Sequence, residues 1–384
     1  MKFFAQPSRF QASRYFAAAL LLGAGSLLAQ SGKPVPPSSE VYKNLKVLGA
    51  TPSDSLNQGM HLISGELGVD CEYCHAADMK WELDEKKTKD TARDMMTMMM
   101  DINRRYFKDE RVITCYTCHQ GKPVPVGTVA LPVGDYFKEK EPGPALPAPE
   151  QLISKYITAI GGEQNIRKIT TRVITATQDL PTGPGGSIPS PGTVEISQKA
   201  PNLVLRIAKT KDVTQTSGAD GKGPWVQDAR GRVNAPGIDV ERIRETRNAD
   251  FYDALDIAKE YPKLKTEAIE KVNGADAYVV LGEPAEGLPV RMYFDAKTGL
   301  LVRRRTELPT HSGVSPFQVD YLDYRDAGHG VKYPYRIHNE PAGPRTEIAT
   351  HSTIRITKIQ ENVALDDAKF NRPPSVDRGG KKKQ

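Results

Sequence analysis

Cysteine is scarce in this sequence of 384 residues, which contains only four of them. All four fall in two copies of one pattern, Cys-Glu-Tyr-Cys-His at residues 71–75 and Cys-Tyr-Thr-Cys-His at residues 115–119. No cysteine is left over for a disulfide framework or for a third motif. The cysteine chemistry of the chain is therefore confined to two short segments.

Long apolar segments are also scarce. The one clear apolar run, Tyr15–Leu28, is shorter than the ~20 residues that a transmembrane helix needs. It follows three basic residues and precedes a plausible cleavage site after Ala29, which predicts a secretory signal peptide over residues 1–29. No cysteine follows the run to carry a lipid, and an uncleaved anchor is the alternative. The sequence thus predicts an extracytoplasmic, periplasmic protein that could associate with the membrane.

The sequence has no internal concentration of positive charge, although its net charge is +6. The predicted signal contributes +3, and residues 31–141 carry 15 Lys and Arg against 17 Asp and Glu, a balance of −2. Four of the remaining positive charges lie in the last nine residues, 376–384, which we expect to be a basic disordered tail. Because the excess lies at the ends of the chain, it does not predict a nucleic-acid partner.

The two Cys-x-x-Cys-His patterns are typical of c-type haem attachment. Each thiol bonds to one vinyl group of the porphyrin, and the histidine that follows supplies a nitrogen ligand to the iron. The sequence therefore predicts two c-type haems, the first bound by Cys71, Cys74 and His75. The second is predicted to be bound by Cys115, Cys118 and His119. A zinc site or a redox Cys-x-x-Cys pair with an incidental histidine is the alternative.

A helix is predicted before the first motif, with Thr51 as its N-cap and Gly68 at its end. Its apolar residues recur at helical spacing: Leu56, Met60, Ile63 and Leu67. Met60 lies on this apolar face, and its thioether is a candidate sixth ligand of the first haem iron. Packing in the core is the alternative role for Met60. His61, about 100° around the helix, is the second candidate ligand.

A second helix is predicted over Thr91–Phe107, and it contains five methionines. One or two of them can bind iron, and the others must pack. Periodicity leaves Met95, Met98 and Met99 as candidates for the second haem iron. No histidine occurs between His75 and His119, so the second haem cannot take a sixth histidine ligand from this part of the chain.

The segment from about Val41 to Gly121 resembles half of the tetrahaem cytochrome subunit of photosynthetic reaction centres. The shared features are a methionine eleven residues before the first cysteine, an Ala-Arg-x-Met-x-x-Met helix that ends in Ile-Asn, and Val-x-Thr before the second motif. In that family the first methionine of the second helix binds iron. The resemblance therefore implies Met95 as the ligand of the second haem, with Met98 as second choice.

The chain departs from this family in two ways. It has two haem motifs where the family subunit has four, and the loop Phe107–Arg111 lacks the histidine that gives one family haem a second histidine ligand. The resemblance thus implies a stand-alone dihaem electron carrier that is not an enzyme. Its partners would be redox proteins, with a membrane-bound complex among them. A dihaem peroxidase with one open haem is the alternative.

Proline marks a boundary after the haem motifs. Residues 122–149 contain seven prolines, a composition typical of an extended, semi-rigid linker. The Pro- and Ser-rich segment 30–40 is expected to be flexible. We therefore predict a dihaem domain over residues 41–121 and a second domain over residues 150–375.

The second domain is predicted to be mainly β. A short helix over Glu150–Ile160 precedes Gly161-Gly162, Pro181–Gly192 is expected to be a loop, and a helical interruption is expected over Asp239–Tyr261. Alternating apolar residues predict eight strands: Arg172–Gln178, Thr193–Lys199, Asn202–Lys209, Ala277–Leu281, Val290–Asp295, Leu300–Glu307, Phe317–Tyr324 and Ile354–Ile359. Such a succession predicts an antiparallel, curved sheet or half-barrel, and a multidomain α + β fold for the whole chain.

The segment Met292–Leu301, together with Asp323–Asp326 and Tyr333-Pro334-Tyr335, resembles LolA- and LolB-like periplasmic lipoprotein carriers. The resemblance implies a sheet wrapped around a helix, with a lipid or apolar ligand. A structural or partner-binding module is the alternative, and a lipid-binding protein with a haem redox module is a third functional hypothesis. The histidines of this part, His311, His329, His338 and His351, lack metal-ligand spacing and are expected at the surface or in turns.

Overall fold

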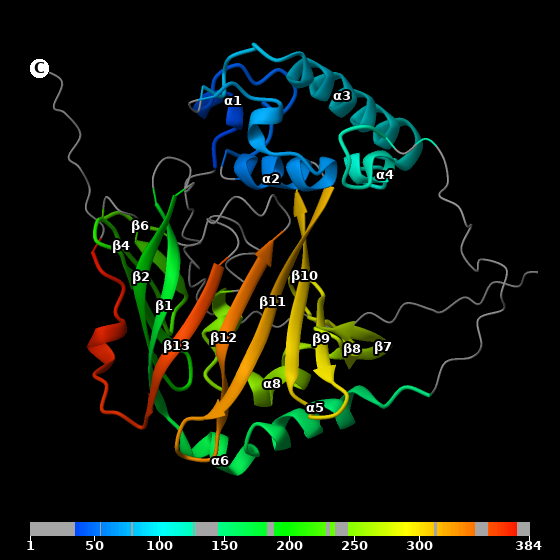
Figure 1. Cartoon of the computed structure of the whole chain (residues 1–384). Helices are drawn as coiled ribbons and strands as arrows, with labels where there is room; N and C mark the ends of the chain where they lie inside the picture. The colour runs from blue at the N-terminus through cyan, green and yellow to red at the C-terminus, as the bar shows by residue number, and fades with distance from the viewer. Residues whose placement is uncertain are drawn as a thin grey trace, which may run out of the picture. The chain divides into compact units, whose positions relative to one another are not determined.

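A computed structural model gives the fold of the chain (Figure 1). It describes residues 35–53, 55–77, 80–125, 127, 145–182, 188–227, 231–234, 245–310, 313–341 and 352–374. The expected signal peptide and the expected basic tail lie outside the described residues. Within the described residues, no helix is both long and apolar enough to cross a membrane.

The part of the chain with the haem motifs is helical. Its elements are α1 (Ser38–Val41), α2 (Leu56–Leu67), the 3-10 helix η1 (Cys71–Tyr73), α3 (Lys87–Phe107) and α4 (Cys115–His119). α1 lies where composition predicts a flexible segment. The Ser38 amide donates to the Thr51 carbonyl at 2.7 Å, and the Ser38 side chain is fully buried.

α2 begins later than the sequence predicts. Its N-cap is Ser55, and the expected cap, Thr51, lies in an extended segment that an isolated bridge between Pro37 and Pro52 holds in place. The predicted end is confirmed, because Gly68 adopts a left-handed conformation with φ 64° at the C-cap. The next helix, α3, begins at Lys87, four residues before the expected start, and ends at Phe107 as predicted.

Two helices precede the sheet, α5 (Pro149–Ala159) and α6 (Glu163–Lys168). Gly161 and Gly162 separate them, with φ values of 126° and 81°. A side chain at Gly161 would approach the Gly330 carbonyl oxygen to 2.1 Å, so this turn requires glycine. The predicted helix over Glu150–Ile160 is thus confirmed to within one residue, as is its glycine end.

The strands of the described residues form one antiparallel sheet with the order β6-β5-β4-β3-β2-β1-β13-β12-β11-β10-β9-β8-β7. Their bounds are β1 Thr171–Thr182, β2 Ile188–Lys199, β3 Leu203–Lys209, β4 Thr214–Asp220, β5 Pro224–Gln227, β6 Val233–Asn234, β7 Lys263–Val272, β8 Ala275–Glu283, β9 Val290–Asp295, β10 Leu301–Thr310, β11 Gly313–Asp326, β12 Lys332–Pro341 and β13 Ser352–Glu361. The sheet is curved and is not closed into a barrel (Figure 1). The predicted α + β class with a curved antiparallel sheet is therefore confirmed.

Every predicted strand is found, but five strands were missed: β4, β5, β6, β7 and β12. The expected loop Pro181–Gly192 is wrong at both ends, because β1 continues to Thr182 and β2 starts at Ile188, with Pro181 opposite Pro189. The expected helical interruption is confirmed where the structure describes it, because residues 245–248 and most of residues 253–261 are helical. Its described helix α8 spans Asp253–Glu260, and residues 235–244 lie outside the described residues.

The main core of the sheet part lies between helices and strands. Its sixteen buried residues come from α5, α6, the turn before α8, α8 itself and the strands β8, β9 and β10, among others. At its centre Ile257 of α8 and Met292 and Phe294 of β9 are fully buried. Strand alternation supplies the apolar face of the sheet, and α5 and α8 cover it.

Candidate haem-attachment site

The first motif forms a tight turn. The Asp70 side chain accepts a hydrogen bond from the Tyr73 amide at 3.1 Å and so caps η1, and the His75 amide donates to the Cys71 carbonyl at 3.0 Å. The turn brings the His75 Nδ1 to 3.3 Å from the Trp81 carbonyl oxygen. The Trp81 ring also lies edge-on to the imidazole, with ring centroids 5.2 Å apart.

The second motif forms one short helix, α4. The Thr114 amide donates to Thr117 Oγ1 at 3.0 Å, an interaction that fixes the start of the helix. At the other end, His119 Nδ1 lies 2.9 Å from the Lys122 carbonyl oxygen. The two motifs thus differ in secondary structure but share the environment of their histidines.

That shared environment fits haem iron. A carbonyl oxygen can only accept, so each Nδ1 must carry the proton, and the lone pair of each Nε2 is available to a metal. Metal-bound histidines in general donate their other ring N–H to such a carbonyl, which fixes the tautomer and the ring orientation. His75 and His119 therefore both have the donor arrangement that an axial haem ligand requires.

The thiols do not resemble those of redox Cys-x-x-Cys pairs, whose pKa values are lowered. Burial raises the pKa of the Cys74 thiol above its ordinary value. Burial and the nearby Glu66 carboxyl raise the pKa of Cys115 to about 12. Among the described residues, no group of three or more His, Cys, Asp or Glu side chains is placed to hold a metal ion. The raised pKa values of Cys74 and Cys115 therefore disfavour the redox alternative.

Exposure separates the candidate methionine ligands of α3. Met99 is 7% exposed and belongs to the core, whereas Met95 is 40% exposed and Met98 is 48% exposed. Met99 is therefore a packing residue, while Met95 and Met98 are both accessible. Met60 of α2 is half-buried. The rival on α2, His61, has its Nε2 3.2 Å from the Asn57 amide nitrogen of the same helix.

α2 and α4 are joined at their ends, which ties the first helix to the second motif. The Gly121 amide donates to the Glu66 carbonyl at 2.9 Å. A side chain at Gly68 would lie 2.1 Å from the Gly121 carbonyl oxygen, so the backbones can approach only because Gly68 has none. The Glu66 carboxyl is buried beside α4. Burial raises its pKa, and hydrogen bonds from the Thr114 side chain and from Cys115 oppose the shift.

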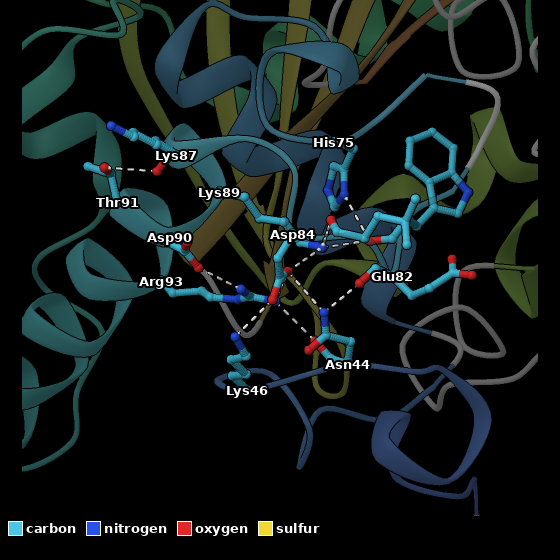
Figure 2. Close-up of polar contacts among 12 residues, drawn as sticks. Asn44, Lys46, His75, Glu82, Asp84, Lys87, Lys89, Asp90, Thr91 and Arg93 are labelled. Atoms are coloured by element: carbon cyan, nitrogen blue, oxygen red, sulfur yellow. Dashed lines mark hydrogen bonds and ion pairs between the residues drawn. The ribbon is translucent and has the colours of Figure 1, made fainter.

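Asp84 is the centre of a charged network beside the first motif (Figure 2). Its carboxylate is 2.8 Å from Lys46, 3.1 Å from Lys89 and 2.9 Å from Arg93. Hydrogen bonds from Arg93, Lys46 and Asn44 hold the pKa of Asp84 well below its usual range. No sequence pattern predicts this network, and its only local signal is Arg93 within the Ala-Arg-x-Met pattern.

Asn103 plays the corresponding role beside the second motif. Its amide nitrogen donates to the Ile113 carbonyl at 2.7 Å, and its amide oxygen accepts from Val112 at 3.1 Å and from Ile113 at 2.9 Å. The side chain is buried. The chain that enters the second motif is therefore attached to α3 by the Asn of the Ile-Asn pattern.

The comparisons with known proteins agree with the sequence patterns of this part. Residues 22–141 match the family described as photosynthetic reaction centre cytochrome C subunit. The chain is 24% identical to the photosynthetic reaction center cytochrome c subunit of Rubrivivax gelatinosus over 271 residues, which are 66% of this chain and 69% of the relative. It is 31% identical to that of Thermochromatium tepidum over 117 residues, 29% of this chain and about a quarter, 26%, of the relative. The chain thus resembles a cytochrome-type electron carrier.

Solved structures resemble somewhat more than half of the chain at low identity. A DUF1329 family protein from Desulfovibrio piger covers 58% of this chain and 96% of its own, with 14% identity and a TM-score of 0.40. A LolA superfamily protein from Nitrosomonas europaea has the same coverage and identity, with a TM-score of 0.38. The predicted likeness to LolA-type proteins is thus found.

The sheet and residues around α8 line an open cavity of about 1440 Å³. Apolar side chains from distant strands line it, among them Val204, Trp225, Val319 and Ile354. The described histidines of this part lie elsewhere. His329 Nδ1 is 2.6 Å from Glu361, and His338 Nδ1 is 2.9 Å from Thr353 Oγ1. His311 and His351 lie outside the described residues.

Proposed function

We propose that this protein is an extracytoplasmic dihaem c-type cytochrome that carries electrons between redox partner proteins. The first haem is bonded to Cys71 and Cys74, with His75 as its axial ligand, and the second to Cys115 and Cys118, with His119. The observation that carries the proposal is the shared arrangement of the two histidines, each with Nδ1 at a backbone carbonyl and Nε2 available.

In this proposal a methionine completes the coordination of each iron. Met60 is the sixth ligand of the first haem and Met95 that of the second, with Met98 as second choice. Thioether ligation raises the haem potential and leaves no open position for substrate. The protein therefore acts as a carrier, and its residues hold the two haems, exclude water and set their potentials.

Haem content and ligand spectroscopy test this function. The purified protein should hold two covalent haems by pyridine haemochrome assay, both low-spin in resonance Raman spectra. Met60→Ala and Met95→Ala should each convert one haem to a high-spin form, because each removes one thioether ligand. Met98→Ala is the matched control, since Met98 is similarly exposed on the same helix.

Two results would contradict the assignment. A high-spin haem in the unchanged protein, with turnover of peroxide, would support the dihaem peroxidase. A Met98→Ala protein with the high-spin haem that we expect from Met95→Ala would move the second ligand to Met98.

The cavity of the sheet supports a second candidate function, the binding of an amphiphile. Two arginines of its lining donate to amide side chains: Arg172 donates to Gln198 at 2.7 Å, and Arg206 donates to Gln178 at 2.8 Å. Desolvation lowers the pKa of Arg206, and the Glu245 carboxylate opposes the shift. The net lowering means that an added anion beside Arg206 would stabilise its charged form. We propose that the cavity takes an apolar chain with an acidic head.

Palmitate and hexadecanol have the same apolar chain but differ in their head groups, so together they test whether the cavity prefers an acidic head. Palmitate should bind more tightly than the neutral alcohol in calorimetric titrations, and Arg206→Gln should remove the difference. Arg355→Gln, at an exposed position of β13 that is not part of the lining, should leave it unchanged. Absence of binding by either probe would contradict the amphiphile function and leave the cytochrome function untouched.

A further inference from the structure

Lys89 occupies a central position in the network beside the first motif (Figure 2). Its ammonium group donates to the Trp81 carbonyl at 2.7 Å and to the Leu83 carbonyl at 2.8 Å, and it lies 3.1 Å from the Asp84 carboxylate. The Lys89 side chain is only 10% exposed. A buried lysine with three such partners is held in one place, and its charge is only partly screened by solvent.

The Trp81 carbonyl that Lys89 contacts is also the partner of His75. Its oxygen lies 3.3 Å from His75 Nδ1 and 2.7 Å from the Lys89 nitrogen. A carbonyl oxygen has two lone pairs and can accept both bonds. Lys89 is therefore linked through this one shared carbonyl to the imidazole that we assign to the first iron.

The second histidine has a different environment. His119 Nδ1 lies closer to its carbonyl, 2.9 Å from the Lys122 oxygen. No side-chain cation of the described residues donates to that oxygen. The two imidazoles thus donate to carbonyls that differ as hydrogen-bond acceptors. The carbonyl beside His75 also accepts from an ammonium group, and the carbonyl beside His119 does not.

This difference has a direct consequence for the two irons. A carbonyl that already accepts from a cation attracts the imidazole proton less, so the ring keeps less negative charge and donates less to the metal. Weaker donation favours the reduced iron. The local charge acts in the same direction, because Lys46, Lys89 and Arg93 outnumber Asp84 and Asp90 in the network.

We propose that Lys89 is a positioning residue that acts through the Trp81 carbonyl and His75 and gives the first haem a higher potential than the second. The proposal rests on the dihaem function above and specifies its direction. Electrons enter at the second haem and come to rest on the first.

A redox titration of the intact holoprotein tests the proposal, with Lys89→Gln, Lys89→Arg and Lys87→Gln as variants. Two midpoint potentials are expected. Lys89→Gln should lower the higher one, with about a tenfold change in the ratio of reduced to oxidised haem, which is ~59 mV for one electron. The lower one should not move. Lys89→Arg, which keeps the charge and the donors, should largely retain the original value.

Lys87→Gln is the matched control. Lys87 lies on the same helix, is exposed, and in Figure 2 directs its ammonium group away from Asp84. The substitution removes the same charge without touching the Trp81 carbonyl, so both potentials should stay near their original values. Asp84→Asn is a further variant, which should shift the higher potential in the opposite direction. It removes the negative charge beside Lys89 and should raise the higher potential.

Several outcomes would overturn the inference. These are a shift of the lower potential by Lys89→Gln, no shift while both haems remain attached, or an equal shift by Lys87→Gln. If Lys89→Gln loses its haem, a fall or no change in the higher potential of Asp84→Asn overturns it. An unchanged protein without two covalent haems would instead contradict the proposed function, and the pyridine haemochrome assay detects that case separately.

Discussion

Asn103 satisfies three backbone groups of the strand-like segment that leads into the second motif. Asn103→Ala would leave the Ile113 carbonyl and two amides without these partners. Loss of buried hydrogen bonds of this kind costs about 1 to 3 kcal/mol. We expect the free energy of unfolding of the holoprotein to fall by about that amount in urea titrations, with less haem attached at the second motif.

Asn103→Asp is the sharper comparison for this residue. It keeps the acceptor for the Val112 and Ile113 amides but replaces the donor that faces the Ile113 carbonyl. We expect it to be destabilised as well, because two oxygens then face each other. If both variants have the stability of the unchanged protein, the Asn103 contacts do not hold the segment.

At the scale of residues, the motifs predict which cysteines and histidines would hold haem, but local patterns do not predict the contacts around them. The two motifs specify their cysteines and histidines because the porphyrin fixes the spacing. Asp84 and Glu66 could not be found in this way. Their partners are set by tertiary packing, as the bond from Arg93 to the Asn44 carbonyl, 49 residues away, illustrates. Periodicity contains no information about such contacts.

At the scale of elements, the end of α2 depends on a glycine. Gly68 has φ 64°, and a Cβ there would lie 2.1 Å from the Gly121 carbonyl oxygen. Gly121 has φ 75°, but a Cβ there would meet nothing within 4 Å. Gly121→Ala should therefore lower the free energy of unfolding by about 1 to 2 kcal/mol, because alanine is strained in the left-handed conformation. Gly68→Ala should lower it by at least about 1 kcal/mol more, because the two backbones must also move apart.

Urea unfolding of both glycine variants measures this difference. The haem absorbance of Gly68→Ala should also change, since the contact joins α2 to the second motif. Equal losses of stability in the two variants would mean that the close approach of the backbones contributes nothing.

α8 makes the stability of the sheet part depend on pH. Burial raises the pKa of Glu260 to about 7 from an ordinary 4.5, with Arg304 opposing the shift and Asp253 adding to it. The folded protein therefore binds the Glu260 proton more tightly than the unfolded protein does. This proton stabilises the folded state fully below pH 4.5, and the stabilisation is lost as the pH rises towards 7.

Glu260→Gln imitates the protonated form and should remove this dependence. Above pH 7 we expect the variant to be more stable by about 1 to 2 kcal/mol, a value discounted because the side chain is partly exposed. Below pH 4.5 the two proteins should be alike. Glu150→Gln, an exposed position in α5, is the control. A stability difference that is constant with pH would contradict the role of Glu260.

Element boundaries show which local signals are strong. Gly68 and Gly161-Gly162 ended helices as predicted, because their positive φ values are a local property. The start of α2 was misplaced because residues 51–53 pair with residues 36–38, which no local pattern reveals. Strand β7 was missed because its charged residues hide the alternation, with the sequence KLKTEAIEKV at the edge of the sheet.

At the scale of the whole molecule, the fold class was predictable but the sheet order was not. Consecutive alternating strands predict an antiparallel meander, and neighbours such as β7-β8-β9-β10 follow it. The central pairing does not, because β1 lies beside β13, with Arg172 opposite Glu361. That pairing encloses nearly 200 residues, and only tertiary packing determines it.

The two parts of the molecule differ in how they are stabilised. Among the described residues 35–125, five apolar side chains are buried: Leu48, Leu56, Leu62, Ala76 and Met99. The sheet part buries sixteen in its main cluster alone. A small helical domain with so few core residues usually needs a cofactor or cross-link to fold. We therefore expect the helical part to depend on its haems and the sheet part to fold without them.

The two tryptophans allow this expectation to be measured in the intact chain. Trp81 contacts His75, so an attached haem should quench its emission, whereas Trp225 is 1% exposed in a cluster of the sheet part. A variant with all four cysteines replaced by serine should lose helical circular dichroism. The unfolding transition followed by Trp225 emission should keep its midpoint, because its cluster with Leu205 and Phe370 contains no haem ligand. A lowered midpoint in the haem-free variant would show instead that the haems stabilise the sheet, and that the chain unfolds as one cooperative unit.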